Sequence, residues 1–167
     1  MFYFDLLQSL YKNKIQYLIV GGVAVNLHGV PRATFDFDLL ISIDKENINN
    51  LLNVLKEDGY LPSLPEDPAG IADPKIVSEW IEKRNLIAFS FYNKTHSHKV
   101  VDIILHHPLD FEKAFERKIV KKVEGFELYL ASIDDLILMK ESSNRSKDRK
   151  DIEFLKKAKK LGEEFGS

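Results

Sequence analysis

The 167-residue sequence contains no cysteine, which excludes disulfide bonds, zinc–thiolate sites and thiol nucleophiles. It has no apolar run close to the roughly 20 residues that a membrane-spanning helix needs. The first residues, MFYFDLLQSLYKNK, lack the basic start and the apolar stretch of a secretory signal. We therefore expect a cytoplasmic protein that makes no contact with a membrane.

An excess of charge of either sign is also absent. The chain has 24 Lys and Arg against 26 Asp and Glu, a formal net charge of −2. This balance excludes a surface built entirely for nucleic acid, although it is compatible with a local basic patch. Hydrophobic residues make up 44% of the chain and charged residues 30%, so residues 1–167 are predicted to form a single globular domain.

Hydrophobic periodicity predicts that strands and helices alternate along the chain. The predicted helices span residues 3–13, 23–28, 45–58, 76–83 and 108–117, with two more after Ser132, and the predicted strands span 15–20, 35–43, 86–92, 99–105, 118–123 and 126–131. This order predicts an α+β fold, a mixed β-sheet with helices packed mainly on one side.

Two segments outside this alternation carry their own signals. Residues 61–74 hold four prolines and are predicted to form a loop. Ser132, with Asp135 three residues later, is a helix-capping pattern. Residues 131–167 are therefore predicted to form a C-terminal helical segment.

Gly21 and Gly22 lie where a predicted strand ends and a helix begins. Glycine lets the backbone approach a ligand closely, and the free N–H groups at the start of a helix bind phosphate. The glycine pair is therefore a candidate nucleotide-binding element. The alternative is a tight strand-to-helix turn with no ligand.

Three aspartates form the candidate catalytic site. Asp36 and Asp38 are two apart in a predicted strand, so both carboxylates project from the same face. Asp102 interrupts KVVDIIL, a run otherwise apolar enough for a central strand, where an acid needs a partner. Divalent cations such as Mg²⁺ bind carboxylate oxygens and relieve their repulsion. The alternatives are solvated acids at a strand edge and an Asp bonded to backbone at a strand end.

This set of motifs resembles the DNA polymerase β-like nucleotidyltransferases. Their pattern is an apolar residue and Gly-Gly or Gly-Ser, a spacer, D-h-D (h, a hydrophobic residue), and a distant third Asp. More narrowly, residues 21–41 look like the stand-alone nucleotidyltransferases related to the AbiEii toxins. The G…R-x-T-x-D-h-D element of that group is met by Gly29, Arg32, Thr34, Asp36 and Asp38.

The C-terminal part is similar to the same group. Its members often end with an apolar helix, a Lys, the sequence R-x-K-D and a last helix. In this sequence Lys140 follows the apolar run, and Arg145, Lys147 and Asp148 supply the second element. The resemblance therefore spans most of the chain.

The resemblance implies transfer of a nucleoside monophosphate from an NTP to an acceptor, with release of pyrophosphate. Asp36, Asp38 and Asp102 would hold Mg²⁺, with two ions expected and Mn²⁺ as an alternative, and Asp102 could accept a proton. The implied nucleotide-binding residues are Gly21, Gly22, Arg32, Thr34, Lys140 and Lys147. A surface ion pair is the alternative for Arg32, a structural role for Thr34, and an exposed surface lysine for Lys140 and Lys147.

The acceptor is left open between RNA, including tRNA, a protein and a small molecule. The toxin relatives add an antitoxin partner to the expected interactions, and the sequence is compatible with a homodimer. Two other functions stay open on the same residues. One is a non-catalytic regulatory domain that binds a nucleotide or a protein, and the other is a metal-dependent phosphohydrolase.

Overall fold

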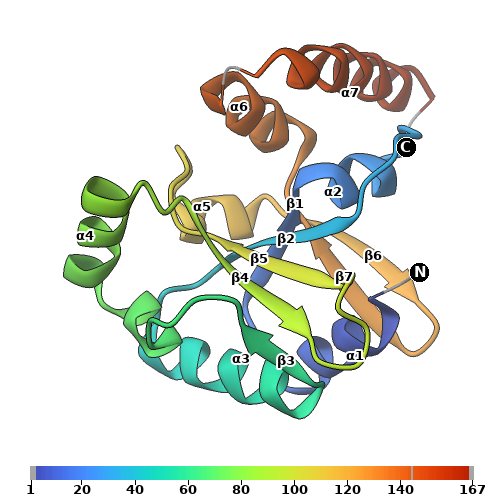
Figure 1. The fold of residues 1–167 in the computed structure, drawn as a ribbon. Helices are drawn as coiled ribbons and strands as arrows, with labels where there is room; N and C mark the ends of the chain where they lie inside the picture. The colour runs from blue at the N-terminus through green and yellow to red at the C-terminus, as the bar shows by residue number, and fades with distance from the viewer. Residues whose placement is uncertain (1–2, 144, 166–167) are drawn as a thin grey trace.

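The computed structural model describes residues 3–143 and 145–165 (Figure 1). Within them, one seven-stranded sheet has the order β3-β4-β5-β2-β1-β7-β6. Its strands are β1 (Tyr17–Val20), β2 (Asp36–Ile41), β3 (Tyr60–Pro62), β4 (Ala88–Asn93), β5 (Val100–Ile104), β6 (Ile119–Val123) and β7 (Phe126–Leu130). The central strand β2 pairs antiparallel with β1 and parallel with β5, so the sheet is mixed.

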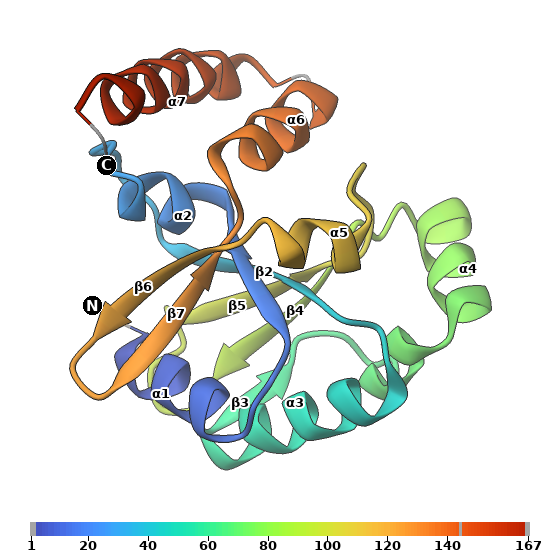
Figure 2. The same cartoon turned by 180° about the vertical axis from the view of Figure 1, so that it is seen from behind.

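Helices α1 and α3 lie together on one side of this sheet, whereas α2, α6 and α7 gather at its other end (Figures 1 and 2). The helices are α1 (Phe4–Lys12), α2 (Gly21–Leu27), α3 (Lys45–Glu57), α4 (Pro74–Arg84), α5 (Phe111–Glu116), α6 (Ile133–Ser143) and α7 (Ser146–Phe165). The predicted α+β fold with a mixed sheet is confirmed. None of the described helices has both the length and the apolar character needed to cross a membrane.

The core explains why β2 presents its carboxylates on the opposite face. Phe37 and Leu39 are fully buried, and Phe37 stacks on Tyr3, just before α1, with ring centroids 4.6 Å apart. Because side chains alternate along a strand, Asp36 and Asp38 point away from this core. The face that α1 covers is thus apolar, and the other face of β2 carries the acids.

Several sequence predictions differ from the structure. Helix α2 begins at Gly21, two residues earlier than expected. The segment 61–74, predicted as a loop, contains the end of β3 and a 3₁₀ turn, Pro68–Ala72. Since β3 is an edge strand, its Pro62 is tolerated opposite Phe91 of β4. The polar run ESSNRS, residues 141–146, predicts a break between the last two helices, but α6 continues to Ser143.

Candidate active site

The structure brings the three predicted aspartates onto one face of the sheet. Asp38 of β2 lies directly opposite Asp102 of β5 in the parallel pairing of these strands. Asp36 precedes on the same face of β2 and is exposed, whereas Asp38 and Asp102 are half-buried. On the far side of β5, Ser90 of β4 is paired with Asp102, and its hydroxyl donates a hydrogen bond of 2.5 Å to Asp102 Oδ1.

Burial and nearby charge shift the pKa values of Asp38 and Asp102. Burial raises the pKa of Asp38 to about 7, and the nearby Asp102 and Asp36 add to the rise, whereas Arg145 and Lys140 oppose it. Burial also raises the pKa of Asp102, against the hydrogen bond from Ser90. Because the pKa values of both carboxylates are raised, a cation between them would favour their charged forms.

The donor chemistry of this face suits a hard divalent cation. Its ligating atoms are carboxylate oxygens from two adjacent strands, and Mg²⁺ prefers oxygen ligands. Among the described residues, no three His, Asp or Glu side chains already converge as a set of metal ligands. The three carboxylates therefore share one face without forming a closed set of metal ligands in this structure.

The glycine pair has a packing role beside these acids. Gly21 has a φ of +67°, and a Cβ atom there would overlap with Asp38 Oδ2. A Cβ on Gly22 would lie 2.5 Å from Thr34 Oγ1 and 3.3 Å from Arg32 Cζ. The two glycines therefore leave room for side chains of the site, which a tight turn alone would not require.

Arg32 and Thr34 lie in the segment between α2 and β2. The Arg32 guanidinium pairs with Asp151 of α7, and the hydroxyl of Thr34 lies 3.5 Å from the carbonyl oxygen of Asp36. Because the Asp151 side chain is buried, this pair is not the surface ion pair that was the alternative for Arg32.

The alternative interpretation of Lys140, an exposed surface lysine, is wrong. Its side chain is buried, and Nζ lies 2.9 Å from Asp151 Oδ2 and 3.3 Å from Asp148 Oδ1. The electrostatic influence of Lys140 on Asp38 links this cluster to the carboxylate face. The side chain of Lys147 lies outside the described part of the chain.

Sequence reasoning missed Ser90 and Asp151. The register of a hairpin decides that Ser90 faces Asp102, and the chain between their strands gives no local sign of it. Asp151 had a detectable signal. It follows Asp148 by three residues in a predicted helix, which places both acids on one helix face after the isolated Lys140.

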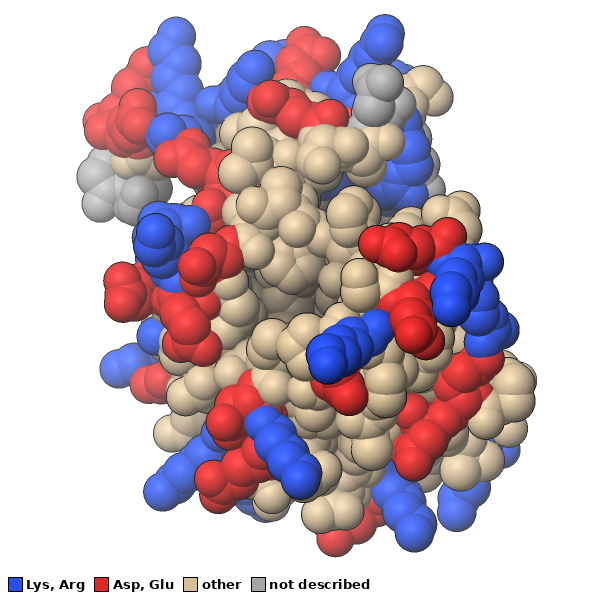
Figure 3. Space-filling model, turned by 90° about the vertical axis from the view of Figure 1, so that its left-hand side faces the viewer, with Lys and Arg blue, Asp and Glu red and all other residues tan. Residues whose placement is uncertain are grey.

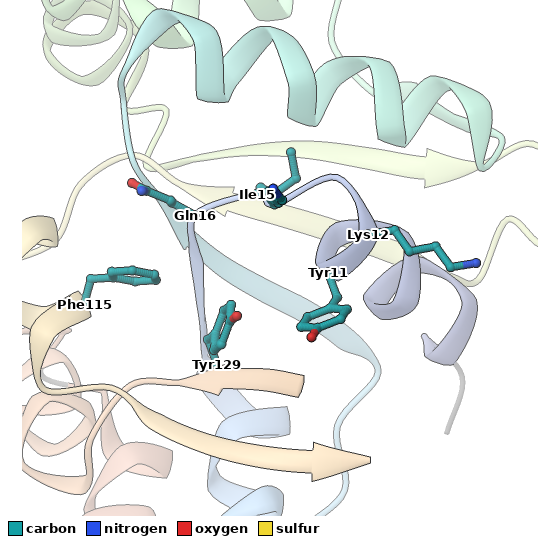
Figure 4. Close-up of a pocket in the computed structure, with 7 residues that line it drawn as sticks. Tyr11, Lys12, Ile15, Gln16, Phe115 and Tyr129 are labelled. Atoms are coloured by element: carbon teal, nitrogen blue, oxygen red, sulfur yellow. The ribbon is translucent and has the colours of Figure 1, made fainter. Parts of the chain in front are cut away.

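The surface of the molecule has two hollows. A cavity of about 420 Å³ lies beside the end of α1 and the start of β1 (Figure 4), lined by Tyr11, Lys12, Lys14, Ile15, Gln16, Phe115 and Tyr129. Figure 3 views the side on which α4 lies in Figure 1, and this side is hollowed below the C-terminal helices. Uncharged side chains line that hollow, with charged groups around its rim.

Comparison with known proteins identifies the family. Residues 4–161 match the family described as a nucleotidyltransferase of unknown function (DUF6036). The chain belongs to this nucleotidyltransferase family. The predicted enzyme class and the general reaction, transfer of a nucleoside monophosphate, are thereby confirmed. A search of curated proteins finds no match for this nucleotidyltransferase.

A solved structure supports the fold. The nucleotidyltransferase is similar to the crystal structure of the lincosamide antibiotic adenylyltransferase LnuA with lincomycin bound, with a TM-score of 0.57. The sequences are 16% identical, and the match covers 93% of this chain and 92% of that one. The narrower relation to the AbiEii toxins, with its antitoxin partner, stays a prediction.

Proposed function

We propose that this nucleotidyltransferase transfers a nucleoside monophosphate from an NTP to a hydroxyl of its acceptor in a Mg²⁺-dependent reaction on the carboxylate face. The observation that carries this proposal is the pairing of Asp38 with Asp102 on adjacent strands, with Asp36 on the same face. Family membership supplies the reaction class, and the three acids are the ionisable groups that share this face of β2 and β5.

Asp36 and Asp38 would hold the ion that binds the triphosphate, and Asp102 would help to hold a second. Mn²⁺ is the alternative metal, because it accepts the same oxygen ligands. When bound, the metal neutralises the phosphate oxygens and makes the α-phosphorus more electrophilic. The raised pKa of Asp38 supports this assignment, since a cation favours its charged form.

Asp102 is the proposed proton acceptor for the attacking hydroxyl. As that proton moves to Asp102, the acceptor oxygen bonds to the α-phosphorus and the bond to the bridging oxygen breaks, so that pyrophosphate leaves. The hydrogen bond from Ser90 occupies Oδ1 of Asp102 and thereby orients the carboxylate. Oδ2 is then the atom that would take the proton.

The remaining predicted residues would bind the phosphates or support the residues that do. Gly21 and Gly22 would offer backbone N–H groups, and Thr34 would steady the backbone of Asp36. Arg32, Lys140 and Lys147 would supply positive charge. Lys140 would act from within its ion pairs, through its positive charge, which opposes the rise in the pKa of Asp38.

For the acceptor, we propose a compact molecule with a free hydroxyl, with RNA and protein as the alternatives. The uncharged hollow below the C-terminal helices supports the compact acceptor, because a polyanion favours a basic surface. The fold of a lincomycin-bound adenylyltransferase also supports it, since that enzyme adenylylates a small molecule.

The test is a label-transfer assay with [α-³²P]NTPs and Mg²⁺, offered a panel of small hydroxyl compounds, total RNA and a protein lysate. The proposal expects label on an acceptor and release of pyrophosphate, and loss of both in Asp38→Asn. A matched control is Asp134→Asn, an exposed acid on α6. Release of inorganic phosphate without label transfer would instead favour a phosphohydrolase.

A further inference from the structure

A buried ionic cluster joins the two C-terminal helices. Lys140 of α6 contacts Asp148 and Asp151 of α7, and the exposed fractions of the three residues are 7%, 2% and 6%. Charges this deeply buried are costly unless each has a partner. The contacts of each acid show which parts of the chain this cluster connects.

Among the described residues, the partners of Asp148 lie on α6 or between α6 and α7. It accepts hydrogen bonds from the Ser143 hydroxyl and from Arg145 Nε, the latter at 2.9 Å, beside its contact with Lys140. Burial alone would raise the pKa of Asp148, but Ser143, Arg145 and Lys140 outweigh it and lower that pKa. Asp148 therefore joins α6 to α7 and reaches no further.

Asp151 reaches out of the helix pair. Its Oδ2 accepts both Lys140 Nζ, at 2.9 Å, and Nη1 of Arg32, which is 119 residues away in the sequence. Arg32 is also held at its backbone, where N donates to Asn26 Oδ1 at 3.1 Å, and Nε lies 3.2 Å from the carbonyl oxygen of Ala33. Asp151 thus fixes the guanidinium of Arg32, whose backbone N–H already has a hydrogen-bond partner.

The position that results places the guanidinium against the glycine pair. A Cβ on Gly22 would lie 3.3 Å from Arg32 Cζ, so the guanidinium packs on the second residue of α2. The Arg32 side chain keeps 27% of its surface exposed, so part of it stays available to a ligand.

We infer that Asp151 is a positioning residue of the nucleotide site, which holds the Arg32 guanidinium beside Gly22 and makes α7 part of that site. The inference rests on the proposed function, because it takes Arg32 to contact the NTP phosphates. Without Asp151, Arg32 keeps its charge but loses its fixed place. An arginine that must be ordered on binding contributes less affinity than one already in place.

The structure offers a matched control for a purely structural role. Lys159 of α7 and Asp134 of α6 also tie the two helices together, at 2.8 Å, and both side chains are largely exposed. This pair joins the same elements but does not contact Arg32. Asp134→Asn therefore removes a link between the helices without disturbing the position of the guanidinium.

The experiment measures the Kd of each NTP with Mg²⁺ by calorimetry, and the Tm without ligand, for wild type, Asp151→Asn, Arg32→Gln, the double variant and Asp134→Asn. We expect Asp151→Asn and Arg32→Gln each to raise the Kd about tenfold, with no further rise in the double variant. Asp134→Asn should leave the Kd unchanged. Asp151→Glu keeps the charge but moves the carboxylate, so it should raise the Kd with little loss of Tm and serves where Asp151→Asn does not fold.

The outcomes separate this inference from the proposed function. An unchanged Kd in Asp151→Asn or Asp151→Glu overturns the inference, as does an additive loss in the double variant, which would mean that Asp151 acts without Arg32. A wild type that binds no NTP overturns both proposals. A wild type whose NTP affinity depends on Asp151 and Arg32 but which labels no acceptor upholds the inference and overturns the proposed function.

Discussion

Gly21 and Asp38 occupy adjoining volumes that leave no room for another carbon atom. Gly21→Ala would place a methyl group on Asp38 Oδ2 at a φ of +67°. Misplacing a catalytic group by about 1 Å costs about a hundredfold in rate, so we predict a loss of transfer of that order. Steady-state kinetics measure it.

Gly29→Ala is the matched control for this prediction. Gly29 has a φ of +96°, but nothing lies within 4 Å of a Cβ built on it. Both substitutions carry a similar backbone strain, about 1 kcal/mol, and only the one at Gly21 moves Asp38. Equal losses of activity in the two variants would contradict the close packing of Gly21 on the carboxylate.

Asp38 also gives the metal-free protein a pH dependence. Its folded pKa is about 7 against an ordinary value of 3.8, so between these pH values the folded protein holds a proton that the unfolded chain has lost. The free energy of unfolding therefore falls as the pH rises through this window. We predict that Asp38→Asn stabilises the metal-free protein at pH 8 by on the order of 2 kcal/mol and has little effect at pH 4.

Urea unfolding at both pH values, without divalent cations, measures this difference. The exposed Asp36 is the control, because Asp36→Asn should also remove transfer but should change the stability much less. A destabilised Asp38→Asn at pH 8 would show that the carboxylate is satisfied without a cation. The site would then lack the electrostatic reason to bind one.

At the scale of elements, Tyr3 joins α1 to the ends of β2 and β5. Its hydroxyl lies 2.8 Å from the carbonyl oxygen of Phe35 and accepts a hydrogen bond from Val100 N at 3.2 Å. Tyr3→Phe keeps the ring stacked on Phe37 but leaves those backbone groups without this partner. We predict a loss of about 1–2 kcal/mol in unfolding free energy.

Tyr17→Phe provides the comparison for Tyr3. The Tyr17 hydroxyl is buried and has no hydrogen-bond partner among the described residues. Removing it should therefore be neutral or stabilising, because a buried polar group without a partner costs free energy. A higher denaturant midpoint for Tyr3→Phe than for Tyr17→Phe would contradict this prediction.

Most of these elements could be predicted because their signals are local. The alternation in β2 places Asp36 and Asp38 together, and the helical stripe of α3 is complete within its own sequence. The start of α2 was missed because glycine has low helix propensity. A larger residue does not fit at position 21, because its Cβ would overlap with Asp38. The short strand β3 depends on its partner β4, which lies about thirty residues later.

At the scale of the whole molecule, the contacts that complete the site join distant parts of the chain. Arg32 and Asp151 meet across 119 residues, and Lys140 is buried by a helix that follows it. A composition with nearly balanced charge gives no sign of which ions pair. The sequence therefore indicates which charged residues are candidates for the nucleotide site, and only the packing of α6 and α7 shows how Arg32 and Lys140 are held.

The proposed function requires that an NTP and a divalent cation bind together at the carboxylate face. The most direct test is the melting temperature with each of the four NTPs, with and without Mg²⁺, for wild type and Asp38→Asn. A ligand at a hundred times its Kd stabilises the folded state by about 2.7 kcal/mol. We predict that at least one NTP raises the melting temperature of the wild type only with Mg²⁺, and does not raise that of Asp38→Asn. The same rise in the variant, or no rise with any NTP at millimolar concentration, would contradict the account.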